Sequence, residues 1–138
     1  MKEKKIVVAS AEDMQSFASD LAATIQSPAI IFLEGDLGAG KTTFVRGFLR
    51  HFNYTDKVKS PTFTLVEPYE LPQQLIFHYD FYRISDPNEL LAMGILDYFQ
   101  LPAIHLIEWP SHVSSQLPSP DLTCKIEFAP QGRILLLS

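Results

Sequence analysis

The sequence is poor in cysteine and glycine, and it has no long apolar run. Its single cysteine, Cys124, can form neither an internal disulfide nor a thiolate metal cluster. No apolar stretch approaches the ~18 residues of a membrane-spanning helix, and the one that follows the charged residues 1–5 is too short for a signal peptide. These absences exclude a disulfide scaffold. We expect no transmembrane helix, and we expect the chain to reside in the cytoplasm.

The composition is otherwise that of an ordinary globular protein. The chain has 138 residues, of which 46% are hydrophobic and 20% are charged, and this excludes disordered, collagen-like and coiled-coil chains. Residues 1–60 hold 8 Lys and Arg against 7 Asp and Glu, whereas residues 61–138 hold 3 against 9. The two balances, +1 and −6, give the net charge of −5, which argues against broad nucleic-acid binding. We expect a single domain over residues 1–138.

Three of the six glycines, Gly35, Gly38 and Gly40, lie within six residues of one another. The stretch from Gly35 to Thr42 matches the pattern G-x-x-x-x-G-K-[ST] in full. Glycines let backbone N–H groups turn inward around phosphate oxygens, and the next helix presents its positive end to them. Lys41 would place a charge between the β- and γ-phosphates, and the Thr42 hydroxyl can bind Mg²⁺. The sequence therefore predicts a nucleotide-binding loop.

The segments around this loop have the required order. Residues 29–33 predict a buried strand before it, and apolar residues at helical spacing over 44–52 predict a helix after it. Ser10, with Asp13 at the capping-box position, predicts the start of another helix. Five further strands are predicted over residues 6–8, 62–67, 75–80, 104–107 and 122–128, and a sixth over 134–137 after a turn at 130–132.

A short helix is predicted to begin at Asp86-Pro87 and to end at Gly94. The early β–α units imply a parallel core, and the later hairpin-like segments add antiparallel strands. We therefore expect an α/β fold of the P-loop NTPase-like type, a three-layer sandwich whose mostly parallel sheet carries added antiparallel strands.

A phosphate loop needs an acidic partner at the end of a neighbouring strand to hold Mg²⁺. Glu108 and Asp80 both stand at such positions. Glu108 follows the more plainly buried strand, so it is the better candidate for the metal. Asp80 would then orient the attacking water or share the outer shell of the metal. Either carboxylate could instead simply cap a loop.

Other polar residues near these acids allow two interpretations each. His78 alternates with Asp80 and so shares its strand face, as a catalytic group or as a hydrogen-bonded core histidine. Arg83 could reach a phosphate, but an ordinary salt bridge is the better prediction. Thr62 and Thr64 could belong to a phosphate-sensing loop or to a plain turn. Trp109 is predicted to serve packing.

Taken together, these segments resemble the TsaE (YjeE) family, whose members are small bacterial ATPases needed for the threonylcarbamoyl modification of tRNA adenosine 37. The resemblance implies ATP and Mg²⁺ as ligands, with weak intrinsic hydrolysis. It also implies association with the two-subunit threonylcarbamoyl transferase, of TsaB and TsaD type, through which tRNA is reached indirectly. The motifs that carry the resemblance lie at residues 35–43, 46–47, 60–66, 78–83 and 108–110.

The same resemblance assigns roles to individual residues. Thr42 and Glu108 would hold the metal, and Asp80 looks like a residue needed for hydrolysis, together with Lys41 and Glu108. Ala11 and Arg133 would lie on the adenine side. The residues that would wrap the phosphates are Asp36, Leu37, Gly38, Ala39, Gly40, Lys41, Thr42 and Thr43.

Three other functions use a similar loop. A small kinase acting on a nucleoside or another small molecule would need an arginine-bearing lid, and only Arg83 and Arg133 lie beyond residue 50. A GTP switch would need a guanine-reading Asn-Lys-x-Asp segment, which the sequence lacks. A nucleotide-gated assembly protein without catalysis stays open, since a slow ATPase can act mainly as a binding switch.

Overall fold

The computed structural model describes residues 3–138. Met1 and Lys2, the start of the charged N-terminal segment, lie outside the described residues. The strands are β1 (Lys4–Val8), β2 (Ala29–Glu34), β3 (Val66–Glu70), β4 (Leu75–Asp80), β5 (Ile104–Glu108), β6 (Leu122–Ala129) and β7 (Gly132–Leu137). The α-helices are α1 (Ala11–Ala22), α2 (Lys41–Arg50) and α3 (Asn88–Ala92), and the short 3-10 helices are η1 (Ile95–Gln100), η2 (Pro110–His112) and η3 (Ser114–Gln116).

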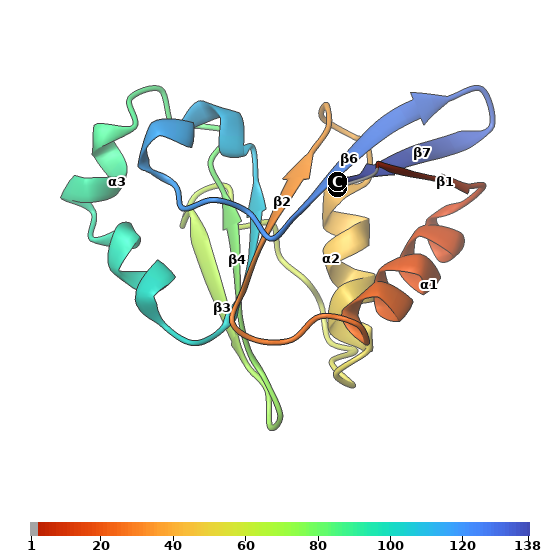
Figure 1. Ribbon diagram of the computed structural model, residues 1–138, viewed down its shortest axis with the longest axis horizontal. Helices are drawn as coiled ribbons and strands as arrows, with labels where there is room; N and C mark the ends of the chain where they lie inside the picture. Colours follow the sequence, from red (N-terminus) through yellow and green to blue (C-terminus); the bar gives the residue numbers. More distant parts are fainter. Residues whose placement is uncertain (1–2) are drawn as a thin grey trace.

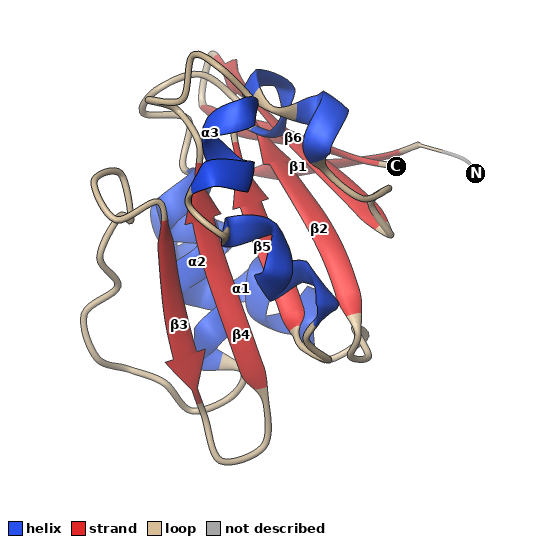
Figure 2. Cartoon of the chain, turned by 90° about the vertical axis from the view of Figure 1, so that its left-hand side faces the viewer, coloured by secondary structure: helices blue, strands red, loops and turns tan. Residues whose placement is uncertain are grey.

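All seven strands form one sheet in the order β1-β7-β6-β2-β5-β4-β3. Figure 2 shows the side of this sheet where β3 and β4 lie beside β5 and β2. Its centre is parallel, because β2 pairs with β5 and β6, and β5 pairs with β4, all in the same direction. Strands β3, β7 and β1 are antiparallel additions on the two sides. The predicted parallel core with added antiparallel strands is confirmed.

Helices cover both faces of the sheet, which makes three layers (Figure 1). On one face, α1 and α2 pack on alternating residues of the central strands, including Ile31, Leu33 and Leu106. On the other face, α3 and η1 pack on a cluster that includes Phe77 and Tyr79. Consecutive residues of a strand point to opposite faces, so β2 and β5 are apolar almost throughout, as a strand covered on both sides must be.

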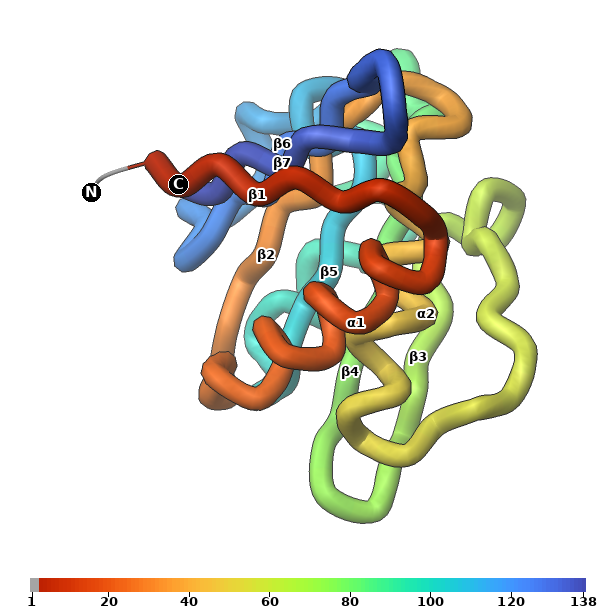
Figure 3. Tube along the Cα trace, turned by 90° about the vertical axis from the view of Figure 1, so that its right-hand side faces the viewer, coloured from red at the N-terminus to blue at the C-terminus, as the bar shows by residue number. Residues whose placement is uncertain are grey.

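The first helix begins as the sequence predicts. The Ser10 hydroxyl accepts a hydrogen bond from the Asp13 N–H at 3.1 Å, and the Asp13 carboxylate accepts one from the Ala9 N–H at 3.3 Å. The first bond satisfies one backbone donor of the helix start, and the second ties the residue before the cap to the first turn. The cap fixes where α1 starts, directly beside the phosphate loop (Figure 3). None of the described helices is long and apolar enough to cross a membrane.

The prediction of a strand over residues 62–67 is wrong in its bounds. Residues 62–65 form a turn, closed by a hydrogen bond of 2.6 Å from the Leu65 N–H to the Pro61 carbonyl, and β3 runs from Val66 to Glu70 through Pro68. Proline donates no backbone hydrogen bond, and it is tolerated here because β3 is an edge strand. The β-branched pattern at Thr62 and Thr64 therefore belonged to a turn.

The predicted helix start at Asp86 is shifted by a residue or two. Helix α3 begins at Asn88, and the Asp86 carboxylate accepts a hydrogen bond of 3.0 Å from the Asn88 N–H. Gly94 follows with a φ of 73° in the left-handed region, which ends the helix as predicted.

Candidate functional site

The glycine loop connects the end of β2 to the first residue of α2. Gly40 caps α2 with a φ of 115°, and Gly35 has a φ of 153°. A Cβ atom at Gly35 would lie 2.7 Å from the carbonyl oxygen of Ile126, so only glycine fits where the loop passes β6. The loop therefore has the backbone that inward-turned N–H groups require.

Lys41 is the first residue of α2 and is only 6% exposed. Its ammonium group donates hydrogen bonds to the carbonyls of Gly35 and Asp36, the latter at 3.1 Å. The same group lies over the ring of Trp109, 4.3 Å from its centre. Burial lowers the pKa of Lys41, and the negative charges of Glu108, Asp80 and Asp36 oppose that shift. The lysine is thus held across the mouth of the loop, next to two carboxylates.

Asp80 and Glu108 end β4 and β5, and their Cα atoms are register partners in this parallel pair. They are 6% and 3% exposed. The carboxyl ends of parallel strands meet at one edge of a sheet, and this edge is where the phosphate loop leaves β2. The two acids predicted from the sequence are therefore brought together beside Lys41.

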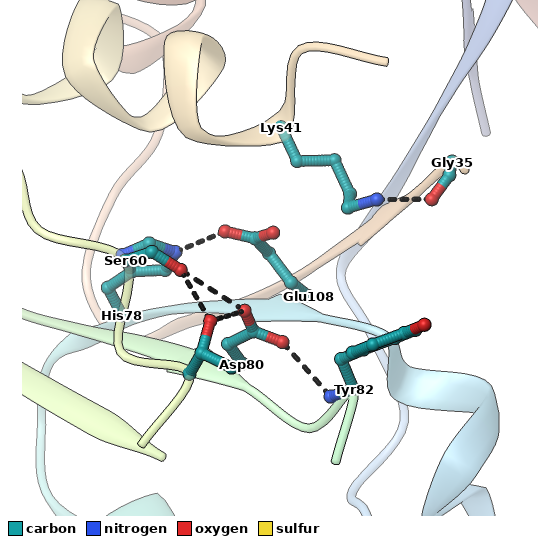
Figure 4. Close-up of polar contacts among 8 residues, drawn as sticks. Gly35, Lys41, Ser60, His78, Asp80, Tyr82 and Glu108 are labelled. Atoms are coloured by element: carbon teal, nitrogen blue, oxygen red, sulfur yellow. Dashed lines mark hydrogen bonds and ion pairs between the residues drawn. The ribbon is translucent and has the colours of Figure 1, made fainter. Parts of the chain in front are cut away.

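Glu108 is held by His78. The Nε2 atom of His78 lies 2.5 Å from the Oε2 atom of Glu108, and the histidine is fully buried. Figure 4 shows one carboxylate oxygen directed at His78 and the other directed away from it. The sequence left His78 as either a catalytic group or a hydrogen-bonded core histidine. The structure shows a buried, hydrogen-bonded histidine whose partner is a candidate metal ligand.

Asp80 is held by a different set of groups (Figure 4). Its Oδ2 atom accepts hydrogen bonds from the hydroxyls of Thr62 at 3.1 Å and Ser60 at 3.4 Å, and its Oδ1 atom accepts one from the Tyr82 N–H at 3.0 Å. The two hydroxyls also bond each other at 2.8 Å. The turn before β3 is thereby docked on Asp80, and Thr62 lies in the site as the sequence suggested.

These groups surround a cavity of about 420 Å³. It contains most of the predicted site residues, together with Ser60, Tyr82 and Trp109, which the sequence did not single out for the site. Trp109 packs against the core cluster on the α3 face of the sheet, as expected, and its ring also lies in the cavity wall, under Lys41. The residues that line the cavity are Leu37, Gly38, Gly40, Lys41, Thr42, Thr43, Ser60, Thr62, Asp80, Tyr82, Glu108 and Trp109.

A second cavity, of about 170 Å³, lies on the other side of the loop. Ala11, Ala39 and Arg133 line it, and Gly38, Gly40 and Thr43 belong to both cavities. Ala11 and Arg133 are 122 positions apart in the sequence, from 11 to 133, yet they share this pocket. Asp36 lies apart from both, in a neighbouring hollow between the loop and β6.

One expectation for the surrounding residues fails, and one open alternative is decided. Arg83 makes no ion pair within residues 3–138; its guanidinium lies over the ring of Phe63, 4.8 Å from the centre. The salt bridge predicted for it is wrong because Asp80 is already enclosed by hydroxyls and a backbone N–H. Thr64 is exposed and does not line the cavity, so of the two threonines only Thr62 lies in the site.

The donor set suits a hard cation that brings its own ligands. No group of three or more His, Cys, Asp or Glu residues able to hold a metal occurs in the part of the chain that the structure describes. Thr42, Glu108 and Asp80 instead offer a few oxygen atoms around one cavity. Mg²⁺ is typically bound by one or two carboxylates together with water and substrate phosphates. The residues present therefore fit a magnesium–nucleotide complex better than a bare metal.

A buried parallel strand, a glycine loop and a helix that begins with the lysine define a P-loop NTPase-like protein. The family profile described as "Threonylcarbamoyl adenosine biosynthesis protein TsaE" matches residues 8–134. The chain belongs to the TsaE family.

Relatives with the name tRNA threonylcarbamoyladenosine biosynthesis protein TsaE agree with this assignment. The protein from Bacillus subtilis is 37% identical over 129 residues, 94% of this chain and 80% of the relative. The one from Haemophilus influenzae is 46% identical over 104 residues, 75% of this chain and 66% of the relative, just under two thirds of its length. The crystal structure of Bacillus subtilis YdiB has a TM-score of 0.82 and 31% identity, and the match covers 99% of this chain and 84% of that chain.

Proposed function

We propose that this protein is an ATP-binding, weakly ATP-hydrolysing subunit that depends on Mg²⁺ and is required for the threonylcarbamoylation of tRNA adenosine 37. The relatives carry the name of that biosynthesis. One observation carries the catalytic part of the proposal: Lys41, Asp80 and Glu108 line a single cavity at the carboxyl edge of the sheet.

The phosphates of ATP would lie in the glycine loop, residues 36–43. The first backbone N–H groups of a helix are free to bind an anion, so those at the start of α2 would bind the phosphates, and the helix dipole favours negative charge there. The Lys41 ammonium now bonds two loop carbonyls and would turn to the β- and γ-phosphates. The pocket shared by Ala11 and Arg133 lies on the other side of the loop and supports an adenine-side position for these two residues.

Thr42 and Glu108 would hold Mg²⁺, with Asp80 available for its outer shell. The metal, when bound, neutralises charge that develops on the phosphate oxygens. Asp80 would orient the attacking water, because its carboxylate is fixed by the hydroxyls of Ser60 and Thr62 at the cavity wall. Among the residues that line this cavity there is one lysine and no arginine. Without an arginine to stabilise the transition state, slow intrinsic hydrolysis is expected.

ATP binding and its slow hydrolysis would act on the two-subunit threonylcarbamoyl transferase, in the cytoplasm, where tRNA is modified. Reconstitution of the protein with TsaB- and TsaD-type subunits and tRNA tests this role. Lys41→Ala should abolish repeated rounds of modification, while Lys57→Ala, which changes an exposed lysine outside the cavity, should leave them intact. Unchanged multiple-turnover modification by Lys41→Ala would refute the proposal, and ATP-dependent phosphorylation of a nucleoside would favour a kinase.

A further inference from the structure

One buried group in the site has no role in the function proposed above. His78 is fully buried in β4, and its Nε2 atom lies 2.5 Å from Glu108 Oε2. Its other ring nitrogen, Nδ1, has no hydrogen-bond partner among residues 3–138. A buried polar atom without a partner costs about 1–3 kcal/mol. An apolar residue would fill this position at lower cost if only packing were needed.

A second buried histidine shows what a purely structural one looks like here. His105, 1% exposed in β5, uses both ring nitrogens: Nδ1 bonds the Tyr79 hydroxyl at 2.7 Å and Nε2 bonds the Leu101 carbonyl at 3.2 Å. It also stacks on Phe77. The contrast is that His78 makes one short bond, and that bond is to a carboxylate at the candidate metal site.

The hydrogen on the short bond can be assigned from its partners. An ionised carboxylate only accepts hydrogen bonds, so Nε2 of His78 carries the hydrogen and donates it to Glu108. This hydrogen bond fixes one carboxylate oxygen of Glu108 and leaves the other oxygen available to a cation.

We propose that His78 is a positioning residue that holds Oε2 of Glu108 and presents Oε1 to the metal of a magnesium–ATP complex. This inference rests on the proposed function. The sheet explains the arrangement, because His78 and Asp80 lie two residues apart on the same face of β4, while Glu108 ends the neighbouring β5. One strand therefore supplies both the water-orienting carboxylate and the group that orients the metal ligand of the next strand.

The test is the Mg²⁺ concentration that gives half of maximal ATP binding, measured by calorimetry alongside ATP binding without Mg²⁺. Loss of an outer-shell partner typically weakens metal affinity about 10- to 100-fold. His78→Leu should therefore need at least about tenfold more Mg²⁺ and leave metal-free ATP binding unchanged. His78→Gln, whose amide nitrogen reaches the position of Nε2, should restore the wild-type requirement. A variant with a damaged fold would instead weaken ATP binding both with and without Mg²⁺.

Matched variants make the result decisive. His105→Leu removes the other buried histidine and should leave the Mg²⁺ requirement unchanged, even if it lowers stability. In a Glu108→Ala background, His78→Leu should have no further effect, since the partner it positions is gone. If His78→Leu does not fold, His78→Asn replaces it, because its shorter amide cannot reach Glu108.

Two results would overturn the inference. The first is a wild-type Mg²⁺ requirement in both His78→Leu (or Asn) and His78→Gln. The second is an equal effect of His78→Leu with and without Glu108. If the wild-type protein bound ATP neither with nor without Mg²⁺, the proposed function would be overturned, and the inference would fall with it.

Discussion

Asp80 and Glu108 face each other as register partners at the ends of two parallel strands, yet they are held by different groups. Glu108 is bonded to His78 from within the sheet, and Asp80 is bonded to Ser60 and Thr62 from the turn before β3. Two adjacent carboxylates that are held by different hydrogen-bond partners can have different roles. Their loss should therefore have separable effects.

We expect Asp80→Asn to bind ATP and Mg²⁺ within about threefold of wild type and to hydrolyse ATP at least about 100-fold more slowly, the usual scale for a positioned catalytic group. Glu108→Gln should instead weaken the Mg²⁺-dependent part of ATP binding, so that more Mg²⁺ is needed for the same binding. Calorimetric titration with and without Mg²⁺, combined with a phosphate-release assay, separates the two. A loss of ATP binding in Asp80→Asn would contradict the division of roles.

Thr62→Val should slow hydrolysis without weakening ATP binding, because it removes one hydrogen bond to Asp80 and nearly preserves side-chain shape. A bond worth about 1 kcal/mol corresponds to a rate effect of about fivefold. Thr64→Val is the matched control, since Thr64 is exposed and outside the cavity. Equal rates for the two variants would show that the turn does not position Asp80.

Arg133→Leu should weaken ATP binding about tenfold, which corresponds to about 1.4 kcal/mol. The Arg133 guanidinium donates to the carbonyls of Ala39 at 3.0 Å and Gly38 at 3.3 Å, so it fixes the backbone of the loop. Hydrogen bonds from a charged donor contribute about 1.5–3 kcal/mol. Arg50→Leu, at the far end of α2, is the control and should bind ATP as wild type does.

Gly47→Ala should destabilise the fold by about 2 kcal/mol. An added Cβ would lie 2.4 Å from Gln15 Cα, so α1 would have to move off α2. Gly94→Ala meets no atom within 4 Å but keeps a φ of +73°, and it should cost about 1 kcal/mol. Urea unfolding measures both, and a smaller loss for Gly47→Ala than for Gly94→Ala would contradict the close helix contact.

Stability should fall as the pH drops below 6.5, in part because of His105. Burial lowers its pKa from the ordinary value of 6.5, so the folded state holds the ring neutral while the unfolded state takes up a proton. The stability that depends on a neutral His105 is fully present above pH 6.5 and is lost progressively as the pH falls below 6.5. His105→Gln should flatten the change in urea midpoint between pH 7.5 and 5.5, two values chosen on either side of about 6.5. If the midpoint changed with pH as much in His105→Gln as in the wild type, the role of His105 in this pH dependence would be refuted.

The sequence predicts the glycine loop, the parallel core and the position of the two acids at strand ends well, because each depends on local pattern. The glycine spacing marks the loop, and apolar runs that end in Asp80 and Glu108 mark buried strands with polar ends. The pattern does not predict which side chains meet across strands. The bond between His78 and Glu108 depends on the register of β4 with β5, and the contact of Arg83 with Phe63 depends on a turn that reads as a strand.

The outer strands of the sheet have a consequence for the behaviour of the protein at high concentration. Both edges expose unpaired backbone groups, which other chains could use to extend the sheet into aggregates. Strand β3 carries exposed Pro68 and Glu70 on one edge, and β1 carries exposed Lys4 and Lys5 on the other. A missing N–H donor and charged side chains at these positions discourage edge-to-edge addition of strands. Pro68, which β3 tolerates because it is an edge strand, thus also protects the sheet against uncontrolled self-association.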